Sequence, residues 1–244
     1  SDVLLYAKGI ADSMKLNVKI HETKISTLAV QGPKSLDVMK KVFGNEISKL
    51  KFFNFNYFKF EGIDFMISKS GFSKQGGYEI YVENLKSGLE LYDYIIKIGN
   101  EFNLKPGCPN VIERIEGALL SYGNDMDNND NPFECGLDKF VNLESNIEFL
   151  GKKALQRVKL EGIKRKLMGV KINEKNINLT SELKLVNENK ETIGYLRSAV
   201  YSPRFKMIVG IAMINRDYCK VSQNFKVNIN NKEVKGLVCA LPFN

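Results

Sequence analysis

The stretch SGFSKQGGYEIYVEN, residues 70–84, places three glycines directly before a short run in which apolar and polar side chains alternate. This alternation predicts a β-strand that starts near residue 78. Its two faces would carry Tyr78, Ile80 and Val82 on one side and Glu79, Tyr81 and Glu83 on the other. If the apolar face packs on a core, Glu79 and Tyr81 point together into the space that the glycine-rich loop covers.

A carboxylate at that place has a specific chemical use. Glu79 can accept two parallel N–H bonds from a planar ligand, such as the edge of an aminopyrimidine or a pterin. Gly71, Gly76 and Gly77 would let the backbone approach a flat ring closely. The alternative is that Glu79 simply lies on the solvated face of an antiparallel hairpin.

Composition places the chain among soluble globular proteins. Its 244 residues are 43% hydrophobic and 26% charged, with a formal net charge of +8. We expect no nucleic-acid partner, because no dense Arg/Lys run with interleaved aromatic residues occurs. We expect no membrane partner either, because no apolar run approaches the ~20 residues of a membrane span. A cytoplasmic location is the simplest expectation.

Histidine and cysteine usage argues against a metal centre. The only histidine is His21, and no residues with ligand spacing accompany it. The four cysteines Cys108, Cys135, Cys219 and Cys239 form no C-x-x-C pair, so we expect reduced thiols and no metal.

The order of predicted elements indicates an α+β protein. Helices are expected at residues 3–14, 34–44, 85–102 and 111–121, and strands at 26–30, 52–62, 63–68 and 78–83. The aromatic run at 52–62 slips in phase, which predicts a bulge or a strand buried on both faces. Residues 124–132, NDMDNNDNP, are expected to form a polar loop that cannot bury itself. After residue 164, short strands follow one another without helices, as in a small barrel or sandwich. We therefore expect two domains, 1–160 and 161–244.

Several motifs occur together in a specific order. They are LAVQGPKS (28–35), SGFSKQGGYEIYVE (70–83), ERIEGALLSYGND (113–125), NPFECGLDKFV (131–141), FLGKKAL (149–155) and IGYLRSAVYSPRFKMIVGIAMI (193–214). In this order the chain resembles the glycine-cleavage T-protein family, the folate-dependent aminomethyltransferases. The resemblance implies folate-binding lobes of ferredoxin-like α+β type, followed by a small C-terminal antiparallel β-barrel.

The resemblance also implies roles for individual residues. The family loop reads like GYTGEDGFEI, and the family glutamate that matches Glu79 holds the pterin ring of tetrahydrofolate. Tyr81 would flank that ring. Arg197 lies in the lobe that caps the folate tail in the family, and its alternative role is a surface salt bridge. We also expect Arg114 and Glu116 to pair with each other on their helix.

Two departures point away from a strict aminomethyltransferase. Lys74 and Gln75 replace an acidic pair of the family loop, and Asn110 replaces an arginine. The loop and the SPRF segment look closer to the dimethylsulfoniopropionate demethylases, which move a methyl group from a sulfonium to tetrahydrofolate. In that comparison Phe72, where those enzymes carry Trp, would face the small sulfonium substrate, and Lys74 would attract its carboxylate.

The family fold begins earlier than this sequence. Roughly its first third, including a family aspartate, is expected to lie before residue 1, so the folate-binding region would be incomplete and the catalytic residue is not predicted. A homo-oligomer or an N-terminal partner segment is then possible. Besides the demethylase, two alternatives stay open: an aminomethyltransferase, and a non-catalytic folate-binding module. The cysteine-containing loop of the related iron–sulfur assembly factors is not found at residues 71–79.

Overall fold

The computed structural model describes residues 2–243, and the chain packs as two compact units. We call Ser1–Gly107 the sheet unit and Cys108–Asn244 the barrel unit. Residues 108–160 therefore pack with the barrel strands, whereas the sequence groups them with the preceding residues. The predicted boundary between residues 160 and 161 stays a prediction.

The sheet unit begins with a helix and continues as a sheet with helices. Its elements are α1 (Asp2–Ser13), β1 (Ser26–Gln31), α2 (Ser35–Phe43), η1 (Asn45–Lys49), β2 (Phe55–Phe60), β3 (Ile63–Ser68), β4 (Gly77–Val82), α3 (Leu85–Gly99) and η2 (Asn100–Phe102). In its described part, four strands pair antiparallel in the order β1-β4-β3-β2. Strand β4 is thus central, between β1 and β3.

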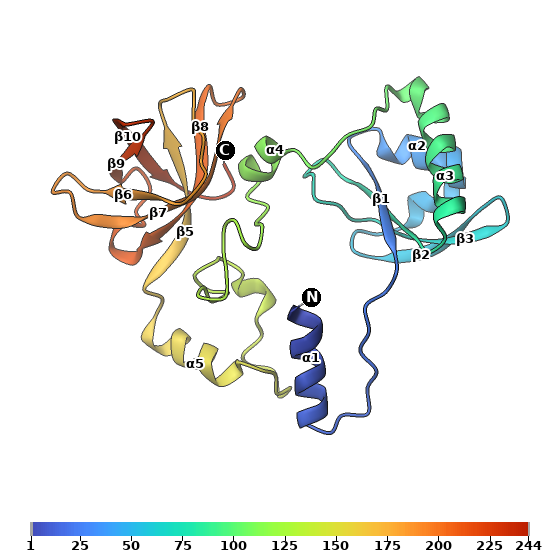
Figure 1. Ribbon diagram of the computed structural model, residues 1–244, viewed down its shortest axis with the longest axis horizontal. Helices are drawn as coiled ribbons and strands as arrows, with labels where there is room; N and C mark the ends of the chain where they lie inside the picture. Colours follow the sequence, from blue (N-terminus) through green and yellow to red (C-terminus); the bar gives the residue numbers. More distant parts are fainter. Residues whose placement is uncertain (1, 244) are drawn as a thin grey trace. The chain divides into compact units, whose positions relative to one another are not determined.

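One face of this sheet is covered by helices α2 and α3 (Figure 1). The core between them holds Val38 and Met39 from α2, and Leu91 and Ile95 from α3. From β4 it receives Tyr78, Ile80 and Val82, the three residues that the alternation assigned to the core face. The other side chains of β4 therefore point to the uncovered face of the sheet.

Strand β2 differs from the prediction. Its pairing with β3 runs without a register shift from Phe55↔Ser68 to Phe60↔Ile63, so it contains no bulge. It is not buried on both faces either, because Phe55 and Tyr57 are each 60% exposed. The phase slip in the sequence arises because this strand carries aromatic side chains on its solvated face as well as on its core face.

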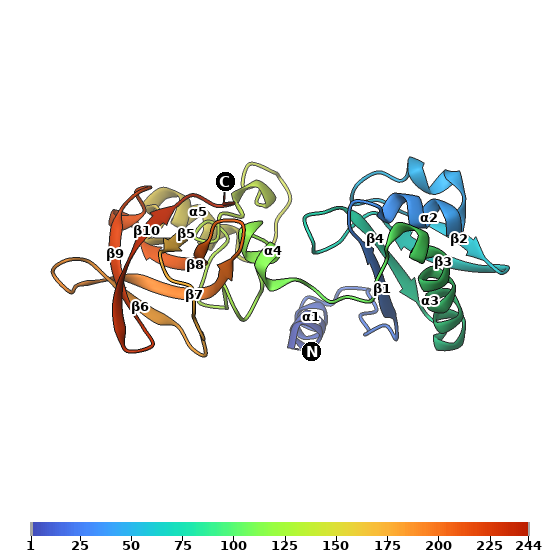
Figure 2. The same ribbon diagram turned by 90° about the horizontal axis from the view of Figure 1, so that it is seen from above.

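The barrel unit combines irregular segments with a closed sheet. Its elements are α4 (Val111–Glu116), η3 (Asp138–Phe140), α5 (Lys152–Glu161), β5 (Arg165–Ile172), β6 (Leu183–Val186), β7 (Thr192–Ser202), β8 (Met207–Asn215), η4 (Arg216–Tyr218), β9 (Asn224–Ile229) and β10 (Lys232–Cys239). Within residues 108–243, six antiparallel strands close into a barrel in the order β10-β5-β8-β7-β6-β9 (Figure 2). The predicted α+β class and C-terminal antiparallel barrel are confirmed.

Helix α4 is shorter than predicted. Asn110 caps its N-terminus, because its side-chain Oδ1 accepts a hydrogen bond of 2.9 Å from the N–H of Ile112. The helix ends at Glu116, and Ala118 adopts a left-handed φ of 53°, which prevents its continuation. Asn110, one of the two departures from the family pattern, therefore has a structural use here.

All four cysteines are free thiols, as expected. Burial raises the pKa of Cys135 to about 11, and the nearby carboxylates of Asp130 and Glu134 act in the same direction. Burial also raises the pKa of Cys239 to about 11. Both thiols stay protonated at neutral pH and are therefore poor nucleophiles.

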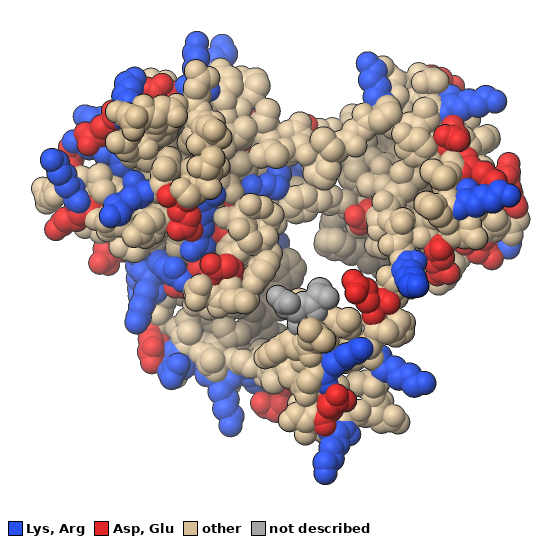
Figure 3. Space-filling view, viewed as in Figure 1, with Lys and Arg blue, Asp and Glu red and all other residues tan. Residues whose placement is uncertain are grey.

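The surface carries charges of both signs. On the face seen in Figure 3, Lys and Arg side chains alternate with Asp and Glu side chains on each unit. That face has no continuous basic stripe of the kind that follows a nucleic-acid backbone. Among the helices of residues 2–243, none is long and apolar enough to cross a bilayer.

The barrel core gives the first testable prediction. Leu196 on β7 is 0% exposed, whereas Leu237 on β10 is 43% exposed. We expect Leu196→Ala to lower the free energy of unfolding by about 2–5 kcal/mol, because it leaves a cavity in a close-packed core. Leu237→Ala is the matched control and should cost less than ~1 kcal/mol. Urea denaturation measures both, and equal costs would contradict the burial assigned to Leu196.

Candidate functional site

Glu79 lies on the uncovered face of the sheet, at the centre of β4. It is paired with Ala29 of β1 on one side and with Ser68 of β3 on the other. Glu79 and Tyr81 are both half-buried, while the residues between and beside them are buried in the core. The structure therefore brings the two predicted ring-binding residues onto one face.

A chain of hydroxyl groups connects these two side chains. The Tyr81 hydroxyl lies 3.4 Å from the Ser68 Oγ atom, which lies 2.5 Å from the Ser70 Oγ atom. The Ser70 hydroxyl in turn donates to the Oε2 atom of Glu79. Only one carboxylate oxygen takes part in this chain of hydrogen bonds. The orientation of the carboxylate is thus fixed by neighbours on β3 and on the loop that follows it.

Gln31, at the end of β1, holds this loop in place. Its Nε2 group donates to the carbonyl oxygens of Ser70, at 3.1 Å, and of Tyr78, at 3.3 Å. Its Oε1 atom accepts a 2.8 Å hydrogen bond from the Ser73 hydroxyl. One side chain therefore joins two residues of the loop between β3 and β4 to the beginning of β4. This glutamine lies within the motif LAVQGPKS, but no pattern in the sequence predicts its role.

The loop glycines serve the fold in a way that the sequence did not predict. A Cβ atom on Gly71 would lie 1.9 Å from the Gln31 Oε1 atom, and one on Gly77 would lie 2.5 Å from the Gln31 Cδ atom. At Gly76 the space is open, but its φ of +79° favours glycine. Gly71 and Gly77 thus make room for the Gln31 side chain, and the expected close approach of the loop backbone to a flat ring stays a prediction.

Phe72 and Lys74 lie at the tip of the loop. Phe72 is 42% exposed, and Lys74 is exposed with a left-handed φ of 61°. Their predicted contacts with a substrate stay predictions.

Arg197 belongs to the barrel unit and is not at its surface. The register between β7 and β8 shifts between Leu196 and Ser198, so Arg197 is the extra residue of a β-bulge. Its side chain is 8% exposed, and its Nη1 atom lies 2.5 Å from the Oδ2 atom of Asp130, whose side chain is 0% exposed. The alternative of a surface salt bridge is therefore wrong, because the ion pair is buried.

The acidic loop at residues 124–132 is also buried in part. Asp125 is 0% exposed, and its carboxylate pairs with Arg114 at 2.5 Å and accepts a 2.5 Å hydrogen bond from the Ser198 hydroxyl. Arg165 reaches Asp130 at 2.9 Å from β5. The expectation of a loop that cannot bury itself is wrong for Asp125 and Asp130, because arginines from α4, β5 and β7 compensate their charges, whereas residues 124 and 127–129 are exposed as expected.

Glu116 has a different partner from the one expected. Its Oε1 atom accepts a 2.6 Å hydrogen bond from the Ser202 hydroxyl, while Arg114 pairs with Asp125. The predicted Arg114–Glu116 ion pair does not form, because the two side chains of this short helix contact different parts of the barrel unit.

The buried pair shifts the pKa values of both partners. Burial alone would raise the pKa of Asp130, but the hydrogen bond and positive charge of Arg197, together with the charge of Arg165, lower it below its ordinary value. Burial alone would lower the pKa of Arg197, but Asp130 and Glu182 raise it. Both groups are therefore charged at neutral pH, and the pair fixes the acidic loop on the barrel.

The arrangement defines a class of protein. An antiparallel sheet covered by helices on one face is followed by an acidic loop and a closed six-stranded barrel, as in T-protein-type folds. The GCVT N-terminal domain matches residues 3–145, and the glycine cleavage T-protein C-terminal barrel domain matches residues 165–244. The chain belongs to the glycine cleavage T-protein family.

Individual relatives agree with this assignment. The chain is 38% identical over 217 residues to a dimethylsulfoniopropionate demethylase of Ruegeria pomeroyi, covering 89% of this chain and 59% of the relative. It is 34% identical over 241 residues to an aminomethyltransferase of Thermoanaerobacter pseudethanolicus, covering 94% of this chain and 64% of the relative. The chain thus spans about three fifths of the length of these relatives.

The fold has a counterpart among solved structures. An aminomethyltransferase T of the glycine cleavage system from Bartonella henselae superposes with a TM-score of 0.85 at 19% identity. The superposition covers 98% of this chain and 66% of that structure. The fold of this chain is therefore that of a T-protein.

The Gln31 contacts give a second prediction. We expect Gln31→Leu to loosen the loop between β3 and β4, because leucine has similar size but cannot make the three hydrogen bonds. Trypsin cleavage after Lys74 should become at least severalfold faster, and the Gly32 amide, which donates to the Gly76 carbonyl at 3.0 Å, should exchange faster. Thr27→Val, at an exposed position on the same strand, is the control. Unchanged cleavage and exchange in Gln31→Leu would contradict the role of this side chain.

The Arg197–Asp130 pair gives a third prediction. We expect Arg197→Gln to lower the free energy of unfolding at pH 7 by about 3 kcal/mol, because it leaves a buried carboxylate undercompensated. Arg204→Gln, at an arginine whose side chain is 65% exposed, should cost less than ~1 kcal/mol.

The same pair predicts a pH dependence. The pKa of Asp130 is lower in the folded than in the unfolded protein. Its contribution to the free energy of unfolding is therefore fully present above the unfolded pKa of ~3.9. This contribution is lost as the pH falls through the lower folded pKa. Wild-type stability should therefore fall more steeply between pH 5 and pH 3 than that of Arg197→Gln. Parallel denaturation curves over this range would contradict the assignment.

Proposed function

We propose that this chain is the folate-binding and barrel part of a tetrahydrofolate-dependent methyltransferase. Its substrate would be a small sulfonium resembling dimethylsulfoniopropionate, whose methyl group is moved to N5 of tetrahydrofolate. The observation that carries the proposal is Glu79, a half-buried carboxylate whose orientation is fixed by Ser70. The 38% identity to a dimethylsulfoniopropionate demethylase supports the choice of methyl donor.

The residues around Glu79 fit a reduced pteridine. The Oε2 atom is engaged by Ser70, whereas Oε1 lies outside that chain of hydrogen bonds and can accept an N–H from a planar ligand. Tyr81, on the same face, would lie beside the ring. When bound, tetrahydrofolate supplies a neutral amine that accepts the methyl group. The task of Glu79 and Tyr81 is to hold and orient it.

Loop residues would act on the sulfonium. Phe72 would place its ring against the sulfonium cation, a cation–π contact of about 0.5–2 kcal/mol. Lys74 would attract the carboxylate of the donor. A sulfonium carries its own leaving group as a neutral thioether, so the site needs positioning and exclusion of water more than acid or base catalysis. The presence of a single histidine in the chain agrees with this requirement.

Arg197 would contribute to the folate tail site in a limited way. Its Nη1 atom is engaged by Asp130 and its Nε atom lies 2.9 Å from Glu182, so a contact with a folate carboxylate would use the Nη2 group. We propose this contact as a second role beside fixing the acidic loop.

A second candidate is an aminomethyltransferase. The 34% identity to such an enzyme over 94% of the chain favours it. Lys74, Gln75 and Asn110 depart from the pattern of those enzymes and favour the demethylase. A third candidate is a chain that binds folate without turnover, because the chain spans 59% of the demethylase. Oligomer formation, an N-terminal partner segment and a cytoplasmic location stay predictions.

Tetrahydrofolate binding tests the proposed anchor. We expect isothermal titration to detect binding to the wild-type chain, and Glu79→Gln to weaken it by at least about tenfold, because a charged hydrogen bond of ~1.5–3 kcal/mol is lost. Glu83→Gln, at an exposed carboxylate four residues later and directly after the end of β4, is the matched control and should bind as the wild type does. Equal affinity of Glu79→Gln and the wild type would refute the anchor.

The methyl donor is tested separately. We expect formation of 5-methyltetrahydrofolate from dimethylsulfoniopropionate without any carrier protein. Product formation only with a lipoyl-bound aminomethyl donor would favour the second candidate. Folate binding with no turnover of either donor would favour the third.

A further inference from the structure

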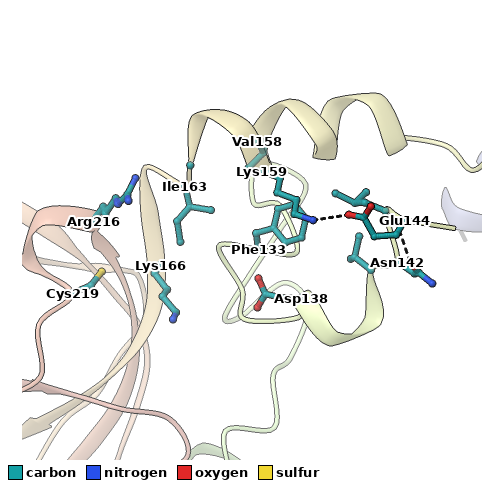
Figure 4. A pocket seen from close by; sticks show the side chains of 13 residues that line it. Phe133, Asp138, Asn142, Glu144, Val158, Lys159, Ile163, Lys166, Arg216 and Cys219 are labelled. Atoms are coloured by element: carbon teal, nitrogen blue, oxygen red, sulfur yellow. Dashed lines mark hydrogen bonds and ion pairs between the residues drawn. The ribbon is translucent and has the colours of Figure 1, made fainter.

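A second candidate site lies wholly within the barrel unit. A cavity of about 600 Å³ opens between the segment 133–144, the C-terminal end of α5 and the short helix η4 (Figure 4). Sites for small organic ligands typically measure about 300–1,000 Å³. The volume of this cavity therefore lies in the range of ligand sites and is larger than that of a packing defect.

The walls of the cavity are largely apolar. They include Phe133, Val141, Leu143, Val158 and Ile163, which come from the segment 133–144, from α5 and from the residues after it. Figure 4 shows the Phe133 ring and the Ile163 side chain directed into the same space. Burial of an apolar body against such walls is favourable by about 25 cal/mol per Å² of area removed from water.

The charged groups at the rim are distributed unevenly. On the α5 side, Glu144 and Lys159 neutralise each other in an ion pair of 2.9 Å. On the barrel side, Lys166 and Arg216 line the cavity, and within residues 2–243 neither forms an ion pair. Asp138 lines the cavity from the opposite side (Figure 4).

The position of Arg216 is defined by its neighbours. Its backbone N–H donates to the Lys164 carbonyl at 2.9 Å. A Cβ atom on Gly162 would lie 2.6 Å from its Nη1 atom, so the guanidinium passes directly over a glycine whose φ is +80°. Cys219 completes this side of the cavity, and burial raises the pKa of its thiol, so it adds no negative charge at neutral pH. The barrel side therefore presents two cations.

We propose that this cavity binds a small amphipathic anion. The apolar body of the ligand lies between Phe133 and Ile163, and its carboxylate or phosphate is held by Lys166 and Arg216. Asp138 accepts a hydrogen bond from a hydroxyl or amine of the ligand. The site is independent of Glu79, so it does not rest on the proposed methyl transfer.

Charge complementarity favours an anion over other ligands. A cationic ligand would be repelled by two cations and attracted by Asp138 alone. A purely apolar ligand would fill the walls but gain nothing from Lys166 and Arg216. An anion gains charge-assisted hydrogen bonds, and a guanidinium can bind it in a bidentate manner.

Simple probes test this proposal on the intact chain. Phenylacetate and phenyl phosphate carry an apolar ring with an anionic group, and phenylacetamide is the neutral counterpart of the first. We expect saturable binding of at least one of the two anions in NMR titrations, with shifts confined to Phe133, Ile163 and their neighbours. Phenylacetamide should bind at least about tenfold more weakly, because it lacks the charge. The comparison of the two anions identifies the preferred head group.

Variants separate the cavity from unspecific adsorption. Lys166→Met with Arg216→Gln should weaken binding of the anion at least about tenfold, and Ile163→Trp should abolish it by filling the cavity. Lys184→Met, at an exposed lysine on β6, is the control for removal of positive charge and should leave affinity unchanged. Thermal melting confirms that each variant is folded.

Three results would overturn the proposal. The first is the absence of saturable binding of either anion to the folded wild type. The second is equal affinity for phenylacetate and phenylacetamide. The third is an unchanged affinity for the anion in the variant that combines Lys166→Met with Arg216→Gln. The tetrahydrofolate affinity of Glu79→Gln affects none of these three results. The proposed anion site and the proposed methyl transfer can therefore be refuted separately.

Discussion

The candidate site depends on the side-chain amide of Gln31. Its three hydrogen bonds join residues 70 and 73 of the loop and residue 78 of β4, which are separated along the chain but all contact one side chain. Two glycines leave the room that this side chain occupies. With the loop held in this way, the Ser70 hydroxyl reaches Glu79 and fixes the orientation of the carboxylate. The Glu79 carboxylate is thus positioned by a residue of another strand that forms no hydrogen bond with it.

The barrel unit uses buried charge for a similar purpose. Asp125 and Asp130 come from a loop rich in asparagine and aspartate, whose burial without cations would be very costly. Arginines from α4, β5 and β7 compensate them, and a β-bulge directs one of these arginines, Arg197, to the loop. Removal of one partner from such a network costs more than the pair contributes by itself, because it leaves a buried charge. The network therefore specifies one conformation of the loop.

The two candidate binding regions differ in chemistry. Glu79 and Tyr81 offer a hydrogen-bonding edge for a planar ligand on an open sheet face. The cavity of the barrel unit offers apolar walls with cations on one side. A ligand that donates N–H bonds would therefore occupy the first region, and an anion with an apolar body would occupy the second. The two regions share no residues, so the two ligands would not compete.

Much of the fold was determined by the sequence alone. The period of two in residues 78–83 placed Tyr78, Ile80 and Val82 in the core and Glu79 on the other face, because successive side chains of a strand point to opposite sides. Turn residues between short apolar runs predicted a small barrel or a sandwich, and the resemblance to the family implied the barrel. Only the tertiary structure decided the role of Gln31, the pairing of Arg197 with Asp130 and the burial of Asp125 beside Ser198, because these contacts join residues 39, 67 and 73 positions apart. Local patterns report which face a side chain occupies, whereas long-range pairing decides which group it meets there.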